Sequence, residues 1–247
     1  MAKDRILNPR IAPRTRTQGP AALRSPGWFA KRPAVGLGMF VLGSLVFGAL
    51  AYNVTAHGPL LRWDVPVLQE LHARAVRSPD PVIEFFNASF FVGKGLVIII
   101  AGLLSAYYLY KRYWRELALS VVGMGGVASL WFFFSRFFGR LRPPFQMGTI
   151  VTDPSFPSGH AATAVLCYGL LAYIWVPRIS SILGKWLVTL ASLLVMAYIG
   201  FGRLFLGAHY PSDIVAGYSL GIAWAGLVFT VIERLFQGGR KQHGDAK

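Results

Sequence analysis

The chain has few charged residues and very few acidic ones. Of its 247 residues only 14% are Asp, Glu, Lys or Arg, and 10 acids stand against 25 bases. A soluble domain carries about a quarter charged residues, so the composition argues against a soluble protein. The net charge of +15 does not indicate a nucleic-acid partner, because the cations are distributed between long apolar segments.

Cysteine is also nearly absent. The single cysteine, Cys167, lies inside an apolar segment, and one cysteine excludes an intramolecular disulfide and a cysteine-rich metal site. We expect Cys167 to serve packing. The sequence also lacks an internal repeat and a Walker-type phosphate loop, which argues against repeat architectures and P-loop nucleotide sites.

Apolar residues are abundant, at 54% of the chain, and they occur in long blocks. A bilayer-spanning helix needs about 20 apolar residues in a row, whereas barrel strands would alternate. We therefore predict an all-α polytopic membrane bundle with six transmembrane helices. The blocks cover about 34–56, 89–110, 116–137, 159–177, 186–202 and 212–235.

The cations predict the orientation of these helices. Eight Lys or Arg residues precede position 34, and others follow the second, fourth and sixth blocks. If the spans alternate, most cations share one side, and the positive-inside rule makes both termini cytoplasmic. We expect an integral protein of the bacterial inner membrane, surrounded by membrane lipids, with the loops after the odd-numbered blocks facing the periplasm or exterior.

The segments outside the blocks are interpreted as follows. We predict a basic, disordered cytoplasmic tail at 1–33, a membrane domain at 34–236 and a second cytoplasmic tail at 237–247. In the outer loop 57–88, DVPVLQELHARAV begins with Asp64 as a plausible cap and has apolar residues at helical spacing. This pattern predicts a short helix at the outer interface.

Glycines recur inside the spans. Gly217 and Gly221 are four residues apart, which is typical of membrane helices that approach each other closely.

Two of the outer loops end in polar motifs that look like helix starts. Pro157 and Ser158 precede Gly159 and His160, and Ser158 is a strong N-cap residue. The first N–H groups of a helix lack internal partners and carry part of the positive end of the dipole. Such an end, opened by a bare glycine, is a candidate anion site. An ordinary cap beside a chance histidine is the alternative.

The second such start holds His209 and Asp213, four residues apart. This spacing would let the carboxylate orient one imidazole nitrogen and leave the other unprotonated as a base or nucleophile. Arg142 and Arg203 on the same side would neutralise phosphate. We therefore predict phosphoryl transfer, with His209 attacking phosphorus and His160 protonating the leaving group, and with no metal or other cofactor.

A metal site is the rival interpretation of the same residues. His160, His209 and Asp213 would make a triad of two histidines and one carboxylate. Arg142 and Arg203 argue against it, because they would place two cations beside a divalent one.

At this point the motifs resemble the type 2 phosphatidic acid phosphatase superfamily, whose pattern is Lys-x6-Arg-Pro, Pro-Ser-Gly-His and Ser-Arg-x5-His-x3-Asp. Arg142-Pro143 ends the first motif, Pro157 to His160 match the second, and Arg203, His209 and Asp213 match the third. The resemblance implies catalysis by His209, His160 and Asp213. It also implies phosphate binding by Arg142, Arg203, Ser158 and the amide of Gly159.

Two positions depart from this pattern. Ser135 stands where the family has its lysine, and Gly202 replaces the serine before Arg203. The lost lysine removes one phosphate-neutralising charge. Arg136, which requires the helix to end or twist there, and Arg140 are candidates to replace it.

The expected function is therefore metal-independent hydrolysis of a lipid phosphate or diphosphate at the outer membrane surface. By resemblance, the substrate classes are isoprenyl diphosphate, phosphatidic acid, phosphatidylglycerol phosphate and lipid A phosphate. Two alternatives stay open. One is a non-catalytic binder or transporter of lipid phosphate, and the other is a phosphotransferase that uses the same phosphohistidine.

Overall fold

The computed structural model describes residues 28–244, and within them the chain is helical with no strand. This confirms the predicted all-α class. The elements are α1 (Trp28–Lys31), α2 (Pro33–Ala56), η2 (Pro59–Leu61), α3 (Asp64–Val76), α4 (Asp80–Gly93), α5 (Gly95–Tyr110), α6 (Trp114–Phe138), α7 (Gly159–Trp175), η3 (Val176–Arg178), α8 (Ile182–Phe205) and α9 (Pro211–Gly244).

Six helical segments of the described chain are long and apolar enough to cross a bilayer, as predicted. They are Pro33–Ala56, Asp80–Tyr110, Trp114–Phe138, Gly159–Arg178, Ile182–Phe205 and Pro211–Gln237. The second begins at Asp80 rather than near residue 89, because α4 continues into α5 with a bend at Lys94 (φ −128°, ψ −64°).

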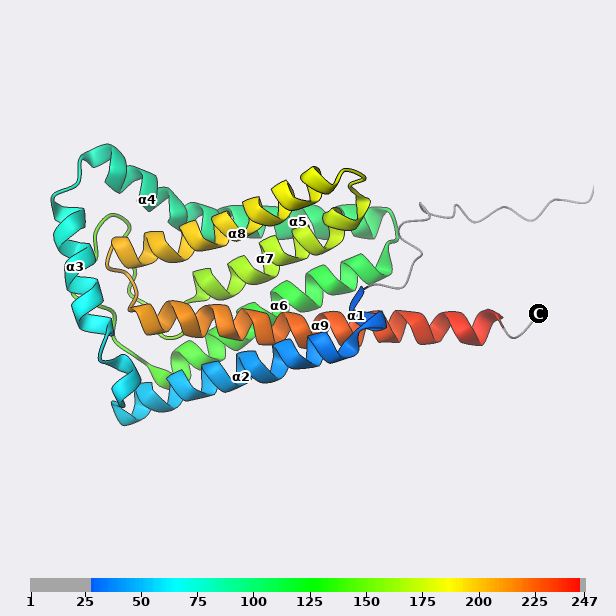
Figure 1. The fold of residues 1–247 in the computed structure, drawn as a ribbon, viewed down its shortest axis with the longest axis horizontal. Coiled ribbons are helices and arrows are strands. Elements are labelled where there is room, and N and C mark those ends of the chain that lie inside the picture. Colours follow the sequence, from blue (N-terminus) through cyan, green and yellow to red (C-terminus); the bar gives the residue numbers. More distant parts are fainter. Residues whose placement is uncertain (1–27, 245–247) are drawn as a thin grey trace, which may run out of the picture.

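The helices form one elongated bundle (Figure 1). The described chain enters at α1 and ends with α9 at the same end of the bundle, while α3 lies across the opposite end. This agrees with six alternating spans. The assignment of that shared end to the cytoplasm remains a prediction.

Helix α9 is the most buried of the six spans, and small residues let its neighbours approach it. A Cβ added at Gly221 would lie 2.8 Å from the carbonyl oxygen of Ala162, and one added at Gly217 would meet Ser158 and lie 2.9 Å from the Ala161 Cβ. The predicted close packing at Gly217 and Gly221 is therefore confirmed, and it joins α9 to the start of α7.

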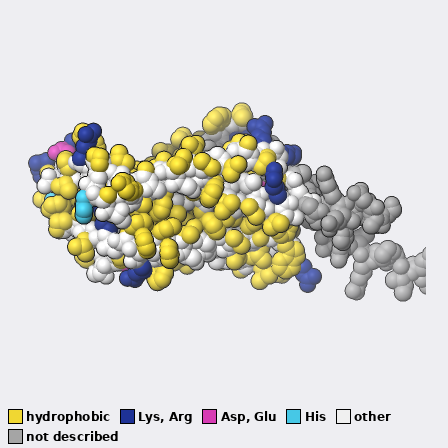
Figure 2. All heavy atoms as spheres, turned by 90° about the horizontal axis from the view of Figure 1, so that it is seen from below, with side chains coloured by type: hydrophobic (Ala, Val, Ile, Leu, Met, Phe, Trp, Pro, Cys, Tyr) yellow, Lys and Arg dark blue, Asp and Glu magenta, His cyan; other side chains and the backbone are white. Residues whose placement is uncertain are grey.

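The outer surface is largely hydrocarbon. Figure 2 shows hydrophobic side chains over most of one flank, with Lys and Arg mainly toward the two ends. On α2, α5 and α8 the exposed apolar side chains include Leu42, Leu45, Leu103 and Leu193. Such a surface is suited to lipid.

Three expectations about the ends and the outer loop need adjustment. The helix at 64–76 is present, but Asp64 makes no capping hydrogen bond in the described structure, and Trp63 occupies the cap position. Residues 28–31 form α1, which packs Phe29 into the core, so they are not tail. Helix α9 continues to Gly244, beyond residue 235. The rest of the predicted N-terminal tail, 1–27, lies outside the described residues.

We expect Gly217→Ala to lower the free energy of unfolding of the detergent-purified protein by about 1–3 kcal/mol, because the new methyl group must displace the Ser158 backbone. The melting temperature should fall accordingly. Gly38→Ala is the matched control, since an added Cβ there meets nothing within 4 Å among the described residues. Equal melting temperatures for the two variants would contradict this packing.

Candidate active site

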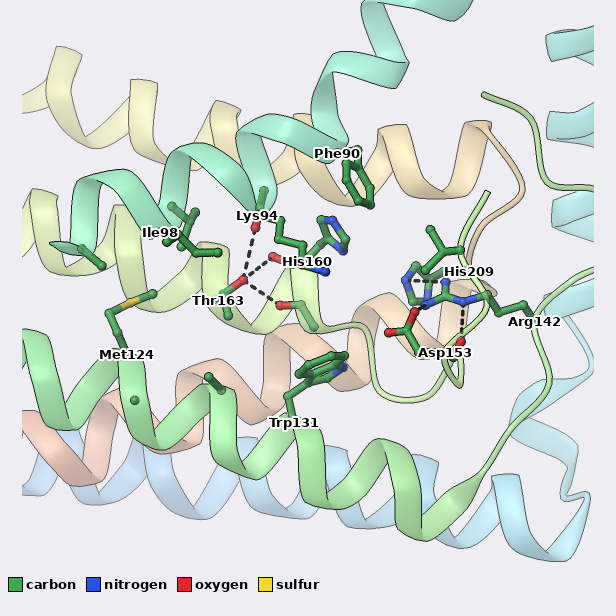
Figure 3. A pocket seen from close by; sticks show the side chains of 17 residues that line it. Phe90, Lys94, Ile98, Met124, Trp131, Arg142, Asp153, His160, Thr163 and His209 are labelled. Atoms are coloured by element: carbon green, nitrogen blue, oxygen red, sulfur yellow. Dashed lines mark hydrogen bonds and ion pairs between the residues drawn. The ribbon is translucent and has the colours of Figure 1, made fainter. Parts of the chain in front are cut away.

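A cavity of about 360 Å³ lies among α4, α5, α6 and α7 and the segment 139–158 (Figure 3). One part of its wall is apolar and comes from α5 and α6: Val97, Ile98, Ala101, Met124, Ala128 and Trp131. The other part is polar: Lys94, Arg142, Asp153, His160, Thr163 and His209. The predicted nucleophile, general acid and first arginine therefore line one space.

His209 is held in one tautomer by its two neighbours. Its Nδ1 is 2.8 Å from the carbonyl oxygen of Ser155, which can only accept a hydrogen bond. Its Nε2 is 3.1 Å from Nη1 of Arg142, which can only donate. Nδ1 therefore carries the proton, and the lone pair of Nε2 accepts the hydrogen bond from Arg142. This is the state that a nucleophilic histidine requires.

The electrostatic environment keeps His209 uncharged. Burial lowers the pKa of His209 to about 4, and the Arg142 charge works in the same direction, while Asp213 opposes both. Because this pKa lies well below 7, the ring is neutral at physiological pH.

Asp213 lies near His209, but it is not the closest partner of the imidazole. Its Oδ2 is 3.6 Å from Nδ1 of His209, and the same oxygen accepts a 2.9 Å hydrogen bond from the Tyr210 N–H. At 3.6 Å the carboxylate is beyond hydrogen-bonding distance, so the bond that the four-residue spacing would allow is not formed. The Ser155 carbonyl takes that place, and Asp213 acts at longer range and through the backbone that carries His209.

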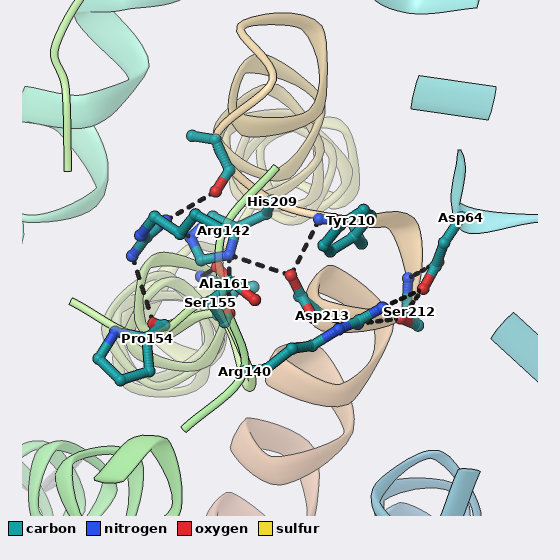
Figure 4. Close-up of polar contacts among 12 residues, drawn as sticks. Asp64, Arg140, Arg142, Pro154, Ser155, Ala161, His209, Tyr210, Ser212 and Asp213 are labelled. Carbon is teal, nitrogen blue, oxygen red and sulfur yellow. Dashed lines mark hydrogen bonds and ion pairs between the residues drawn. The ribbon is translucent and has the colours of Figure 1, made fainter. Parts of the chain in front are cut away.

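Arg140 does not line the cavity. In Figure 4 it lies on the far side of Asp213 from His209. Its Nη1 donates to Asp213 Oδ1 at 2.6 Å, and its Nη2 donates to Asp64 Oδ2 at 2.8 Å. Burial opposes the charge of Arg140, but the two carboxylates outweigh it and raise its pKa. Arg140 is thus already paired and does not line the cavity, so the structure does not bring it to the predicted phosphate.

Asp64 completes this cluster from α3. It accepts hydrogen bonds from the backbone N–H (2.9 Å) and the hydroxyl (2.5 Å) of Ser212 at the start of α9. The outer helix is therefore bonded directly to the element that carries Asp213.

Arg136 is not brought to the site. Its guanidinium lies 5.5 Å from the Phe132 ring on an exposed face of α6, and the side chain does not line the cavity formed by the described residues. The helix neither ends nor twists at 135, so the side chain at 136 points elsewhere. Ser135 is buried and donates to the Phe132 carbonyl at 3.0 Å.

Arg142 ties two loops together. Its Nε donates to the Asp153 carbonyl at 2.6 Å, and its Nη1 donates to the Ala208 carbonyl at 2.7 Å as well as to His209. Burial lowers the pKa of Arg142, and Asp153 opposes that shift. Arg142 thus lines the cavity while it holds the backbone of Asp153 and of Ala208, the residue before His209.

Arg203 and His160 differ from Arg142 in that side-chain nitrogens of both lack hydrogen-bond partners among the described residues. Arg203 is fully buried, and its three guanidinium nitrogens find no hydrogen-bond partner among the described residues. The Nε2 of His160 is also buried, with no partner in the described part of the chain. The Phe90 ring contacts both, at 5.2 Å from Arg203 Cζ and 5.0 Å from the imidazole centroid. Unpaired donors of this kind are costly, and an anion would satisfy them.

Ser158 is the N-cap of α7 as predicted, since its hydroxyl accepts from the Ala161 N–H at 3.5 Å. The side chain is buried and does not line the cavity. Gly159 does line it, and a Cβ there would lie 2.7 Å from the Trp131 ring. Glycine is therefore required at this position, and the start of α7 faces the cavity through Gly159 and His160.

The described residues contain no group of three or more His, Cys, Asp or Glu side chains that could hold a metal ion. His160, His209 and Asp213 thus do not form the rival triad.

Four residues of this region were missed by sequence reasoning. Ser155 acts through a carbonyl that no side-chain pattern reveals, and the two contacts of Asp64 join residues far apart in the chain. Phe90 is one of many aromatics. Lys94 did carry a signal, because it is a charge within an apolar block.

Comparison with known proteins gives relatives of one kind. The sequence model of the PAP2 superfamily matches residues 96–237. Phosphatidylglycerophosphatase B of Bacillus subtilis is 30% identical over 57% of this chain and 67% of its own length. Lipid A 1-phosphatase of Rhizobium etli is 28% identical over 70% of this chain and 78% of its own. An undecaprenyl-diphosphatase of Sulfolobus acidocaldarius is 28% identical over 40% of this chain and 43% of its own.

A solved structure has the same fold. The crystal structure of a transmembrane PAP2 type phosphatidylglycerolphosphate phosphatase from Bacillus subtilis aligns with a TM-score of 0.61. The alignment covers 82% of this chain and 96% of that one, at 21% sequence identity.

We expect histidine-labelled protein in detergent to show, by ¹⁵N NMR, a neutral His209 ring with its proton on Nδ1 at pH 7. The ring should gain a second proton only as the pH falls to about 4, because burial disfavours the charged form. The spectrum of His209→Gln assigns the signal. A ring that is protonated at pH 6, or a proton on Nε2, would contradict the geometry.

Proposed function

Because the chain belongs to the PAP2 superfamily, we propose that it hydrolyses a lipid phosphate or diphosphate through a phosphohistidine on His209. The observation that carries the proposal is a pair of buried side chains without partners, one of which, His160, lines the same cavity as His209. Arg203 and His160 have no hydrogen-bond partner among the described residues, and a phosphate is the anion whose oxygens match a guanidinium fork.

The phosphate is proposed to sit between the two arginines and the start of α7. Arg142 lines the cavity beside His209 Nε2, and Gly159 brings the helix start to the same space. Two guanidinium groups and the positive end of a helix would neutralise the charge that spreads over the oxygens during transfer.

In the first step, Arg142 moves its hydrogen bond from His209 Nε2 to a phosphate oxygen. The freed Nε2 lone pair then attacks phosphorus and forms the N–P bond as the bond from phosphorus to the lipid oxygen breaks. His160, in its imidazolium form beside the bound anion, donates a proton to that oxygen. The lipid product leaves with a hydroxyl, or with a shortened phosphate if the substrate was a diphosphate. The Ser155 carbonyl and the Asp213 carboxylate stabilise the positive charge on the His209 ring.

In the second step, neutral His160 accepts a proton from water as the water oxygen attacks phosphorus. The N–P bond breaks, His209 recovers its Nε2 lone pair, and inorganic phosphate is released. The two histidines end in their starting protonation states, so neither a metal nor another cofactor is required by this sequence of steps.

The cavity wall supports a lipid as the carrier of the phosphate. The residues from α5 and α6 are apolar, including Ile98, Met124 and Trp131, and these helices expose hydrocarbon to the bilayer. A chain could therefore remain in an apolar environment while its phosphate reaches the arginines. The relatives named for phosphatidylglycerol phosphate, lipid A and undecaprenyl diphosphate give the candidate substrate classes, beside phosphatidic acid.

We place the site at the outer surface of the membrane. It lies toward the end of the bundle that α3 crosses, away from the end where the described chain begins and finishes. If both termini are cytoplasmic, as the cation distribution predicts, the phosphate is removed on the periplasmic or exterior side.

We expect the detergent-purified protein to release inorganic phosphate, in chelator, from at least one of phosphatidic acid and an isoprenyl diphosphate. His209→Ala should reduce release by about 10³-fold or more, because no other group supplies the nucleophile. A matched control is His57→Asn, because His57 is exposed at the end of α2 with φ 51°, a conformation that Asn tolerates.

Each failure of that assay has its own meaning. A folded wild-type protein that binds but does not hydrolyse either lipid would support the binder. Transfer of the phosphoryl group to an added alcohol or lipid in place of water would support the phosphotransferase. Release that requires an added divalent ion would contradict the two-histidine mechanism.

His160 has a distinct kinetic signature. We expect His160→Ala to slow release from a lipid alkoxide by about 10²–10⁴-fold, the usual contribution of a general acid. Release from p-nitrophenyl phosphate should fall much less, because nitrophenolate leaves without a proton. Equal losses on the two substrates would show that His160 does not act as the acid.

A further inference from the structure

The proposed phosphate site lacks the cation that the family pattern places at position 135. Ser135 is buried, and its hydroxyl is used on the Phe132 carbonyl. Neither nearby arginine fills the gap, because Arg136 stacks on Phe132 outside the cavity and Arg140 is paired with Asp64 and Asp213. Any replacement charge must therefore come from another element.

Lys94 reaches the same cavity from the opposite wall. It is the residue at which α4 ends and α5 begins, and it lines the cavity together with Arg142, His160 and His209. Figure 3 shows Lys94 and His160 near each other, with His209 and Arg142 on the other side.

The backbone before Lys94 is fixed against the proposed general acid. A Cβ at Gly93 would lie 2.9 Å from Cδ2 of His160 and 2.8 Å from Ile199. Only a glycine therefore lets this turn approach α7. Lys94 is the next residue after Gly93. Because Gly93 packs against His160, the Lys94 side chain also begins beside His160.

The ring of Phe90 brings the charges together. Lys94 Nζ lies 5.9 Å from its centroid, Arg203 Cζ lies 5.2 Å away, and the His160 ring lies 5.0 Å away. One aromatic side chain thus touches the proposed acid, a motif arginine and the extra lysine. Cation–π contact stabilises such a lysine modestly, but it does not neutralise it.

No carboxylate of the described residues pairs with Lys94 in this arrangement. An ammonium group within a membrane span is costly unless it faces an aqueous cavity or a counter-charge. We propose that the counter-charge is the substrate phosphate, and that Lys94 supplies the cation missing at position 135. This inference rests on the proposed function, because it assigns a residue to that same phosphate site.

The test uses full-length protein in detergent and two readouts, kcat/KM for lipid phosphate and the stabilisation of the protein by orthovanadate. Vanadate reports phosphate binding without turnover. We expect Lys94→Gln to lower kcat/KM and the apparent affinity for vanadate each by about 10- to 100-fold, the range for a charge-assisted hydrogen bond. Lys94→Arg should restore most of the effect, because it keeps the charge.

Lys111→Gln is the matched control. Lys111 ends the same helix, and its Nζ also lies over the ring of the preceding aromatic, Tyr110, at 5.1 Å, but it does not line the described cavity. Its loss should leave both readouts unchanged. Lys94→Met keeps the aliphatic stem on Phe90 and replaces the Gln variant if that one does not fold.

The outcomes separate the two proposals. If wild-type protein hydrolyses lipid phosphate and folded Lys94→Gln matches it in both readouts, Lys94 only extends into the cavity and the inference fails. If vanadate binding depends on Lys94 but wild type hydrolyses no lipid phosphate, the proposed function fails while the phosphate contact stands. If Lys94→Arg is as weak as Lys94→Gln, charge is not the cause and the inference is overturned.

Discussion

Burial of guanidinium groups with too few acceptors is the constraint around which this end of the bundle is arranged. Arg142 donates to loop carbonyls, and Arg140 donates to two carboxylates. Arg203 donates to none of the described residues. A charge in a low-dielectric interior must be compensated or it destabilises the fold. The first two arginines therefore hold the scaffold together, and the third is the one for which we propose a phosphate as the counter-charge.

The same division explains the state of His209. A carbonyl on one side and a guanidinium on the other leave a single consistent proton position. Each neighbour favours the same tautomer. The Ser155 carbonyl is available because the segment 139–158 is fastened by Arg142, and that segment returns directly into the cap of α7. The proposed nucleophile and the start of α7, which carries the proposed acid, are thus both held by one loop.

The sequence was sufficient for the architecture, and it named three residues that the fold brings to one cavity, Arg142, His160 and His209. Long apolar blocks specify helices in lipid without ambiguity, and Ser158 and Pro211 mark helix starts by their own backbone chemistry. The roles of Arg136 and Arg140 could not be predicted in this way. The direction of the side chain at 136 depends on where α6 ends. The pairing of Arg140 depends on Asp64, which lies far away in the chain. Such partners are set by tertiary contacts, which local patterns do not encode.

The bond between α3 and the start of α9 has an evolutionary consequence. Asp64, Arg140 and Asp213 form a chain of alternating charge in which the arginine is shared by both acids. Losing Asp64 would leave Arg140 with one acid, and losing Arg140 would leave both acids buried without their cation. Substitutions at positions 64 and 140 should therefore occur together in divergent sequences. Position 64 of the surface helix should then vary as little as a buried position, while the outward-facing residues of that helix vary freely.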